Sequence, residues 1–368
     1  MARPLKEQVE RELADRFLRR SLMRLGWEEQ QLVAKTMRFL ERKLLPHLQR
    51  LLQAELTKLE EKLGRGAQSL ESVRLETMLE RVNDLVDGSY KDLATITLDS
   101  ATAIVAREAN ATHAILRKVF PVDIQLRQPN TAVLKQLMKE RPMSGRLLKD
   151  HFDQLSGATK RAIDTQVRLG ASLGESVPKI KARIVREIGG TVDGPVAKQV
   201  RRQAEAIART APHHAAAQAR IEVAKANPKV VRAWRWDATL DAKTCPWCAS
   251  RDGREYPHDR GTSPPPLHNQ CRCHPAFVVN GEILRAAGFK DLDTSKLRRP
   301  SENGPVKYGT RFEEWLGTQP KGWVDSWMGK ERAELWRKGA PLDSLVDPRK
   351  LNFKPLAEAR RVAARRGA

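Results

Sequence analysis

The sequence has no run of about 18 consecutive apolar residues, so we expect no membrane-spanning helix and no membrane partner. Its first residues, Met1 to Arg11, alternate in charge and lack the apolar centre of a signal peptide, so we expect no secretion signal there. The P-loop, the G-x-G-x-x-G motif and the H-E-x-x-H motif are also missing. These absences argue against membrane transporters and against common nucleotide-binding and zinc-protease enzymes.

Acidic residues are scarce relative to basic ones. The chain has 45 Asp and Glu against 67 Lys and Arg, which gives a formal net charge of +22. So large an excess points to a polyanionic neighbour, of which nucleic acid is the most common, and predicts non-specific binding of double-stranded DNA. The alternative is a basic surface that only faces solvent. The candidate DNA-binding residues are Arg201, Arg202, Arg209, Arg220, Arg360, Arg361, Arg365 and Arg366.

Apolar spacing predicts helices through most of the first 227 residues. A leucine stripe from Leu44 to Leu63 has three- and four-residue steps, and Pro46 should kink or restart the helix that carries it. Further helices are expected at 69–86, 90–118, 145–170 and 196–226. The fold class is therefore mainly α, with long N-terminal and central helices.

Near residue 228 the pattern of apolar residues changes from helical spacing to the alternation of a strand. Residues Val230 to Asp237 alternate as a strand that places Trp234 and Trp236 on one side, and prolines and glycines become dense. We therefore predict a small irregular α+β module of short strands and loops at 228–280, which we call the cysteine module. The predicted domains are an N-terminal helical region (1–120), a central helical part (121–227), the cysteine module (228–280) and a Trp-rich, basic C-terminal tail (281–368).

Cysteines are few, and all four lie between residues 245 and 273. Cys245 and Cys248 form a C-x2-C pair, Cys271 and Cys273 form a C-x-C pair, and His268 precedes the second pair. Thiolate and imidazole are the ligands that zinc prefers, and two such pairs about twenty residues apart close a tetrahedral site. The sequence therefore predicts one structural zinc ion that staples this module.

The sequence is compatible with two sets of zinc ligands. One is the four cysteines, and the other is Cys245, Cys248 and His268 with either Cys271 or Cys273. His258 and His274 are weaker candidates. A zinc deaminase would need an H-x-E motif, which none of the nearby histidines provides, and a thioredoxin-like pair would need a βαβ context. We therefore predict no catalytic residues and no enzymatic activity.

These residues resemble a family. The series Trp236, Thr239-x-Asp241, Thr244-Cys-Pro-x-Cys248, Asp252-Gly253 and Pro265-Pro-x-His-x-x-Cys-Arg-Cys273 is similar to the signature of Mu F-like minor head proteins of tailed bacteriophages. Arg209-Thr210 also matches a family position, although Ala211 stands where relatives commonly have an acid. The resemblance covers about residues 145–345.

The resemblance implies a head morphogenesis protein. Such a protein would lie inside the head of the virion near the portal, would be present in the host cytoplasm during assembly, and would bind portal, scaffold or capsid proteins. Two surfaces are candidates for that contact: Trp315, Trp323, Trp327 and Trp336, unless they pack against the cysteine module, and the leucine stripe of the N-terminal helices. The competing hypotheses are a zinc-dependent, nuclease-like enzyme and a DNA-binding regulator.

Overall fold

The computed structural model describes residues 21–63, 72–119, 125–176, 194–258, 262–280 and 298–365, with the short pieces 179–180, 182–183, 186 and 282–283. The chain divides into two compact units. The helical unit comprises residues 26–104 and 135–215, and the mixed unit comprises residues 1–25, 105–134 and 216–368. No helix in the described ranges combines the length and the apolar content that a membrane span needs.

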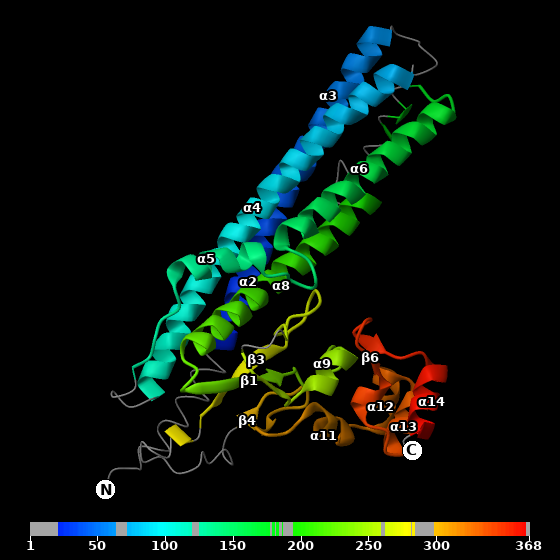
Figure 1. Ribbon diagram of the computed structural model, residues 1–368. Coiled ribbons are helices and arrows are strands. Elements are labelled where there is room, and N and C mark those ends of the chain that lie inside the picture. Colours follow the sequence, from blue (N-terminus) through cyan, green and yellow to red (C-terminus); the bar gives the residue numbers. More distant parts are fainter. Residues whose placement is uncertain are drawn as a thin grey trace. The chain divides into compact units, whose positions relative to one another are not determined.

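Long helices build the helical unit, in which they run side by side (Figure 1). The helices of this part of the chain are α2 (Ser21–Phe39), the π-helix η2 (Leu40–Leu44), α3 (Leu45–Leu63), α4 (Ser72–Val119), α5 (Thr131–Glu140), α6 (Leu148–Ser172) and α8 (Pro195–Ala226). Four of them, α2, α4, α5 and α8, contribute residues to both units. The predicted mainly α class is confirmed.

Pro46 does not end the helix that carries it. The helical run from α2 to α3 is continuous, and the π-helical turn η2 comes directly before Pro46, with helical φ and ψ at Phe39 and Leu45 on its two sides. Leu44 and Leu48 of the leucine stripe are buried, so this part of the stripe belongs to the core and does not form a free surface for a partner. The side chains of Leu52, Leu56, Leu59 and Leu63 lie outside the described residues.

The helix that follows is longer than the sequence suggested. We expected two helices, at 69–86 and 90–118, but α4 is one continuous helix of 48 residues. Gly88 lies in its middle with open space around the position of a Cβ atom. Because a glycine in a helix interior costs only about 1 kcal/mol, the packed residues on either side keep the helix intact.

Helices α4 and α6 are antiparallel neighbours. The Tyr90 hydroxyl of α4 lies 2.8 Å from the Thr159 hydroxyl of α6, and both groups are buried. One turn away, Asp87 accepts hydrogen bonds from Lys160 and Ser156. Burial raises the pKa of Tyr90 to about 12, so this hydroxyl stays protonated and serves as a structural hydrogen-bonding group.

A buried histidine ties α8 to the loop before α6. Nε2 of His214 lies 3.3 Å from the carbonyl oxygen of Arg141, and since a carbonyl only accepts, the histidine donates. Burial lowers the pKa of His214 to about 4. Between pH 6.5 and 4, His214 is therefore protonated in the unfolded chain and neutral in the folded chain.

Acidification should weaken the fold through this residue. As the pH falls from 6.5 to 4, the free energy of unfolding should drop by about 3 kcal/mol from His214 alone, since one pKa unit corresponds to about 1.36 kcal/mol. The free energy of unfolding is measured with urea at several pH values for the wild-type protein and for His214→Gln. All other groups titrate in both proteins, so the difference between the two pH dependences is the contribution of His214. Equal pH slopes in the two proteins would contradict the prediction.

The mixed unit is built around a three-stranded antiparallel sheet in the order β2-β1-β3. Its strands are β1 (Val231–Asp237), β2 (Glu255–Tyr256) and β3 (His274–Val279), and its further elements are α9 (Pro246–Arg251), β4 (Arg298–Arg299), β5 (Val306–Lys307), α11 (Phe312–Gly317), α12 (Lys321–Met328), α13 (Lys330–Arg337), η3 (Leu342–Leu345), β6 (Val346–Asp347), β7 (Asn352–Phe353) and α14 (Leu356–Arg365). The predicted change from helix to strand near residue 228 is confirmed, and Trp234 and Trp236 are both buried on the sheet.

The tryptophans of the C-terminal region form a core of their own. Phe312, Trp315 and Leu316 are its buried centre, and Trp323, Trp327 and Trp336 pack around it. Leu240 and Ala249 of the cysteine module belong to the same cluster, and the indole N–H of Trp327 donates to the Thr244 carbonyl at 3.1 Å. Our prediction of a free tryptophan surface for a partner is therefore wrong, and the alternative, packing against the cysteine module, is what the structure has.

Candidate metal centre

The first cysteine pair lies at the start of α9. Cys245 is the N-cap residue, and its sulfur accepts a hydrogen bond from the backbone N–H of Cys248 at 3.3 Å. Pro246 occupies the first helical position, where its fixed φ fits and its missing N–H is not needed. The turn thus directs both sulfurs to one side of the helix start.

The second pair and the histidine come from the segment before β3. Cys271 and Cys273 are buried, and the Cys271 sulfur lies 3.7 Å from that of Cys248. Nε2 of His268 lies 3.1 Å from the Cys245 sulfur. The structure therefore brings all five predicted ligands into one cluster, with chemistry that suits a soft or borderline metal ion.

Hydrogen bonds between Cys245 and His268 shift the pKa values of the two groups in opposite directions. The hydrogen bond from Cys248 and the neighbouring His268 lower the pKa of the Cys245 thiol to about 5. Burial opposes protonation of His268, but its hydrogen bonds to Cys245 and Cys271 outweigh burial and raise its pKa to about 11. The two groups therefore pair as a thiolate and an imidazolium, and a metal ion that binds both would displace the proton on His268.

A surface ion pair joins the two segments that carry the cysteines. Arg272 donates two hydrogen bonds to the carboxylate of Asp241, one of them at 2.8 Å. Asp241 also accepts the backbone N–H of Lys243 at 2.9 Å, which shapes the loop before Cys245. The C-R-C and T-x-D parts of the motif therefore bind each other directly.

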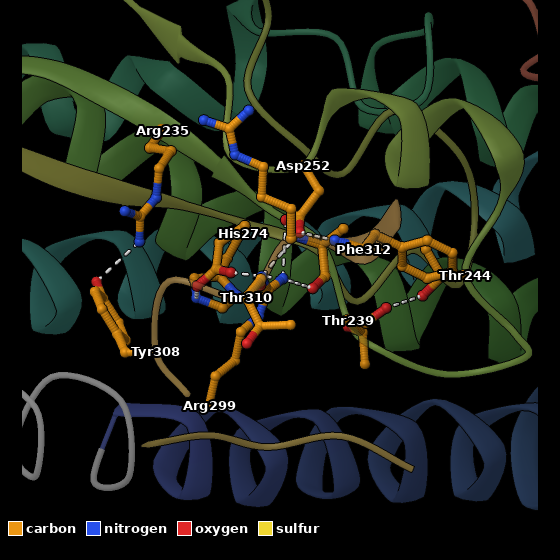
Figure 2. Close-up of polar contacts among 12 residues, drawn as sticks. Arg235, Thr239, Thr244, Asp252, His274, Arg299, Tyr308, Thr310 and Phe312 are labelled. Carbon is orange, nitrogen blue, oxygen red and sulfur yellow. Dashed lines mark hydrogen bonds and ion pairs between the residues drawn. The ribbon is translucent and has the colours of Figure 1, made fainter. Parts of the chain in front are cut away.

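A second, buried network includes Asp252, His274 and Arg299 (Figure 2). Arg299 donates to both carboxylate oxygens of Asp252 at 2.8 Å, and it also binds Asp237 at 2.8 Å. His274 lies 3.2 Å from the other oxygen of Asp237. Burial opposes the charge on Asp237, but His274 and Arg299 hold the pKa of this carboxyl far below its usual range.

Sequence reasoning missed this network. Asp252 and His274 stand in or beside the motif, but Arg299 follows it by more than twenty residues in a region that offers no pattern. An arginine in a loop-rich stretch normally faces solvent, so only the fold identifies it as buried. The network acts structurally, because its donors and acceptors are used by one another and by backbone groups of Ala238, Thr310 and Phe312.

Several arginines predicted to bind DNA are engaged within the protein. Arg220 is buried and pairs with Glu108 at 2.8 Å, so it cannot reach a phosphate, and its inclusion among the DNA-binding candidates was wrong. Arg209 binds Glu29 and Glu205, and Arg201 binds Glu41. The basic face of α8 is thus partly neutralised by acids of its own unit.

Other predicted DNA-binding residues face solvent. Arg202 is exposed on α8, and Arg361 and Arg365 are exposed on α14, where Ala359 and Ala363 form the buried side. Arg360 is also exposed and pairs with Glu331. Arg366 lies outside the described residues.

Comparison with known proteins gives one match. Residues 161–276 match the family model described as Phage Mu protein F like protein. The match supports a phage Mu F-like head morphogenesis protein and so confirms the resemblance seen in the sequence. It spans the second half of α6, α8 and most of the cysteine module. Searches of curated proteins and of solved structures give no match.

Proposed function

We propose that this chain, which carries a phage Mu F-like head morphogenesis domain, is a non-enzymatic minor protein of the phage head interior that binds the portal or scaffold and contacts the packaged DNA. The observation that carries the proposal is the family match across the segment that also holds the cysteine cluster. That cluster gives the domain a structural zinc centre, in which four protein ligands leave no open position for a substrate.

A zinc-dependent nuclease is the alternative, and the geometry of His268 speaks against it. A catalytic histidine needs a free ring nitrogen, but Nδ1 of His268 bonds the Asn269 carbonyl and Nε2 faces the Cys245 sulfur. Both nitrogens are therefore used inside the cluster. Added Mg²⁺ or Mn²⁺ should give no nuclease activity above that of His268→Ala.

Incorporation into heads tests the structural role. The protein should be recovered in procapsids assembled by co-expression with its neighbouring portal, scaffold and capsid proteins. Trp315, Leu44 and Leu48 are buried, and Trp323, Trp327 and Trp336 pack against the C-terminal core, so we look for the contact among exposed apolar residues. Trp27 is 60% exposed and Leu173 is 61% exposed, so Trp27→Ser and Leu173→Ser are the first variants to examine. Absence of the wild-type protein from procapsids and virions would refute the proposal.

DNA binding should be electrostatic and independent of sequence. Each phosphate contact releases counterions, so affinity should fall steeply with salt, with a slope of about 0.9 per contact in a double-logarithmic plot. Changing Arg361 and Arg365 to Ala should reduce that slope by about two and leave any sequence dependence unchanged. Mobility shifts at several salt concentrations measure it.

Arg220→Met is the control for a buried charge. It removes one positive charge from a buried position, against two exposed charges in the tail variant, so the salt slope of the folded protein should not change. If the tail variant binds with the wild-type slope, α14 is not part of the DNA contact. A strong preference for one sequence would contradict the electrostatic account.

A further inference from the structure

The candidate ligands come from two separate segments of the chain. The first segment carries Cys245 and Cys248, and the second carries His268, Cys271 and Cys273. Two groups have ligand atoms that all lie within 4.8 Å of one another: Cys245, Cys248 and His268 in one, and Cys248, Cys271 and Cys273 in the other. Each group takes residues from both segments. An ion held by either group therefore joins the two segments, and it is released as their ligands separate.

The residue between Cys271 and Cys273 points away from the cluster. The two cysteines are buried and Arg272 is exposed, an alternation that is typical of extended chain. The Arg272 guanidinium donates to both carboxylate oxygens of Asp241, and the bond to Oδ1 is 2.8 Å long. The Asp241 side chain is only 16% exposed. The second segment is thus bound in a two-pronged manner to the loop that leads into Cys245.

The loop that holds Asp241 is itself fixed to the C-terminal region. The backbone N–H of Ala242 donates to a carboxylate oxygen of Glu302 at 2.9 Å, and the indole N–H of Trp327 donates to the Thr244 carbonyl at 3.1 Å. Asp241 Oδ1 also accepts the backbone N–H of Lys243, which holds the turn of this loop. Arg272 therefore binds to an anchored part of the chain.

On the basis of the zinc centre proposed above, we propose that the Arg272–Asp241 pair is a latch that slows release of the metal ion. The pair and the ion connect the same two segments, so the ligands of the two segments separate only when the pair also breaks. Both are positioning residues, since neither is a candidate ligand. Groups that support metal ligands change metal affinity by about 10- to 100-fold. Because the Arg272 side chain is 40% exposed, we expect the lower end of that range.

The rate of zinc release into an excess of a chromogenic chelator tests the latch. Asp241→Asn keeps an acceptor for the Lys243 N–H and removes the charge that binds Arg272, and Arg272→Gln removes the charge of the other partner. Each variant should release zinc about tenfold faster than the wild-type protein. The double variant should be no faster than either single variant, because all three lack the same pair. Added salt should speed release from the wild-type protein more than from the variants.

Two further variants serve as controls. Arg272→Lys keeps the charge and loses the two-pronged geometry, so its rate should lie between those of the wild-type protein and Arg272→Gln. Glu255→Gln breaks the exposed pair of Arg232 and Glu255, which joins β1 to β2, and should release zinc at the wild-type rate.

Three results overturn the latch and leave the zinc centre standing. They are unchanged release in both charge variants, faster release for Asp241→Asn alone, which would mean that Asp241 acts only through its own loop, and effects that multiply in the double variant. A wild-type protein that binds no zinc overturns both proposals.

Discussion

Removal of the metal ion should unfold the cysteine module and leave the long helices folded. Three of the seven buried residues in the cluster around the site are cysteines, so separation of the ligands breaks up the core that holds Trp234, Trp236 and Ile221 together. Structural zinc contributes about 10–16 kcal/mol in small domains that fold only with metal, and the effect here should approach this range for residues 231–280. The helical unit has its own core, and most helical residues should keep their structure.

Hydrogen exchange of the protein after a chelator has removed its metal ion tests this prediction. Amides of β1 and β3 should lose protection, while those of α6 should keep it. The near-ultraviolet circular dichroism should also change, because the rings of Trp234 and Tyr256 stack at 4.6 Å. Cys248→Ser should reproduce the chelated state, and Lys243→Ala, an exposed change in the same loop, should not. Intact protection of β1 without metal would contradict the prediction.

The helices were predictable because their stability is local. In α6, Leu148, Phe152, Leu155 and Ile163 recur at helical spacing and are all buried, as the pattern requires. The break expected between residues 86 and 90 was wrong for a non-local reason. Glycine is only a weak signal, and the buried Val86 and Tyr90 on either side hold the helix in place.

The cysteine cluster was predictable because metal ligands need a particular spacing. The C-x2-C turn, the histidine and the C-x-C pair identify the site without any knowledge of the fold. The partners of charged residues are different. Arg220 and Glu108 meet across 112 residues, and the type of residue alone does not distinguish the buried Arg220 from the exposed Arg202 of the same helix. The prediction from charge composition therefore gave this helix a larger DNA-binding surface than its exposed arginines can form.

The buried network around Asp252 should dominate the stability of the mixed unit after the metal. Both oxygens of this carboxylate are occupied, because Arg299 binds them in a bidentate manner and the backbone N–H groups of Ala238 and Phe312 donate at 2.7 Å. Phe312 begins α11 and Ala238 follows β1. One side chain thus joins the cysteine module to the C-terminal core.

Asp252→Asn should lower the free energy of unfolding of the mixed unit by about 3 kcal/mol, the lower end of the usual cost of breaking a buried ion pair, because Arg299 keeps Asp237 as its other partner. The asparagine amide would point hydrogens at Arg299 or at a backbone N–H, so at least one donor loses its acceptor. Arg299→Lys should cost less, because lysine keeps the charge and loses only the two-pronged geometry. Denaturant unfolding, followed by tryptophan fluorescence, measures both variants.

The matched control is a solvent-exposed pair on the three-stranded sheet of the same unit. Arg232 binds Glu255 at 2.7 Å, and both side chains are at least 40% exposed, so Glu255→Gln should cost about 1 kcal/mol or less. The contrast separates burial from charge, since each variant replaces one carboxylate by an amide. Equal losses for Asp252→Asn and Glu255→Gln would mean that the buried network contributes no more than a surface ion pair. In that case the apolar cluster of Leu240, Ala249 and Phe312 would be what joins the cysteine module to the C-terminal core.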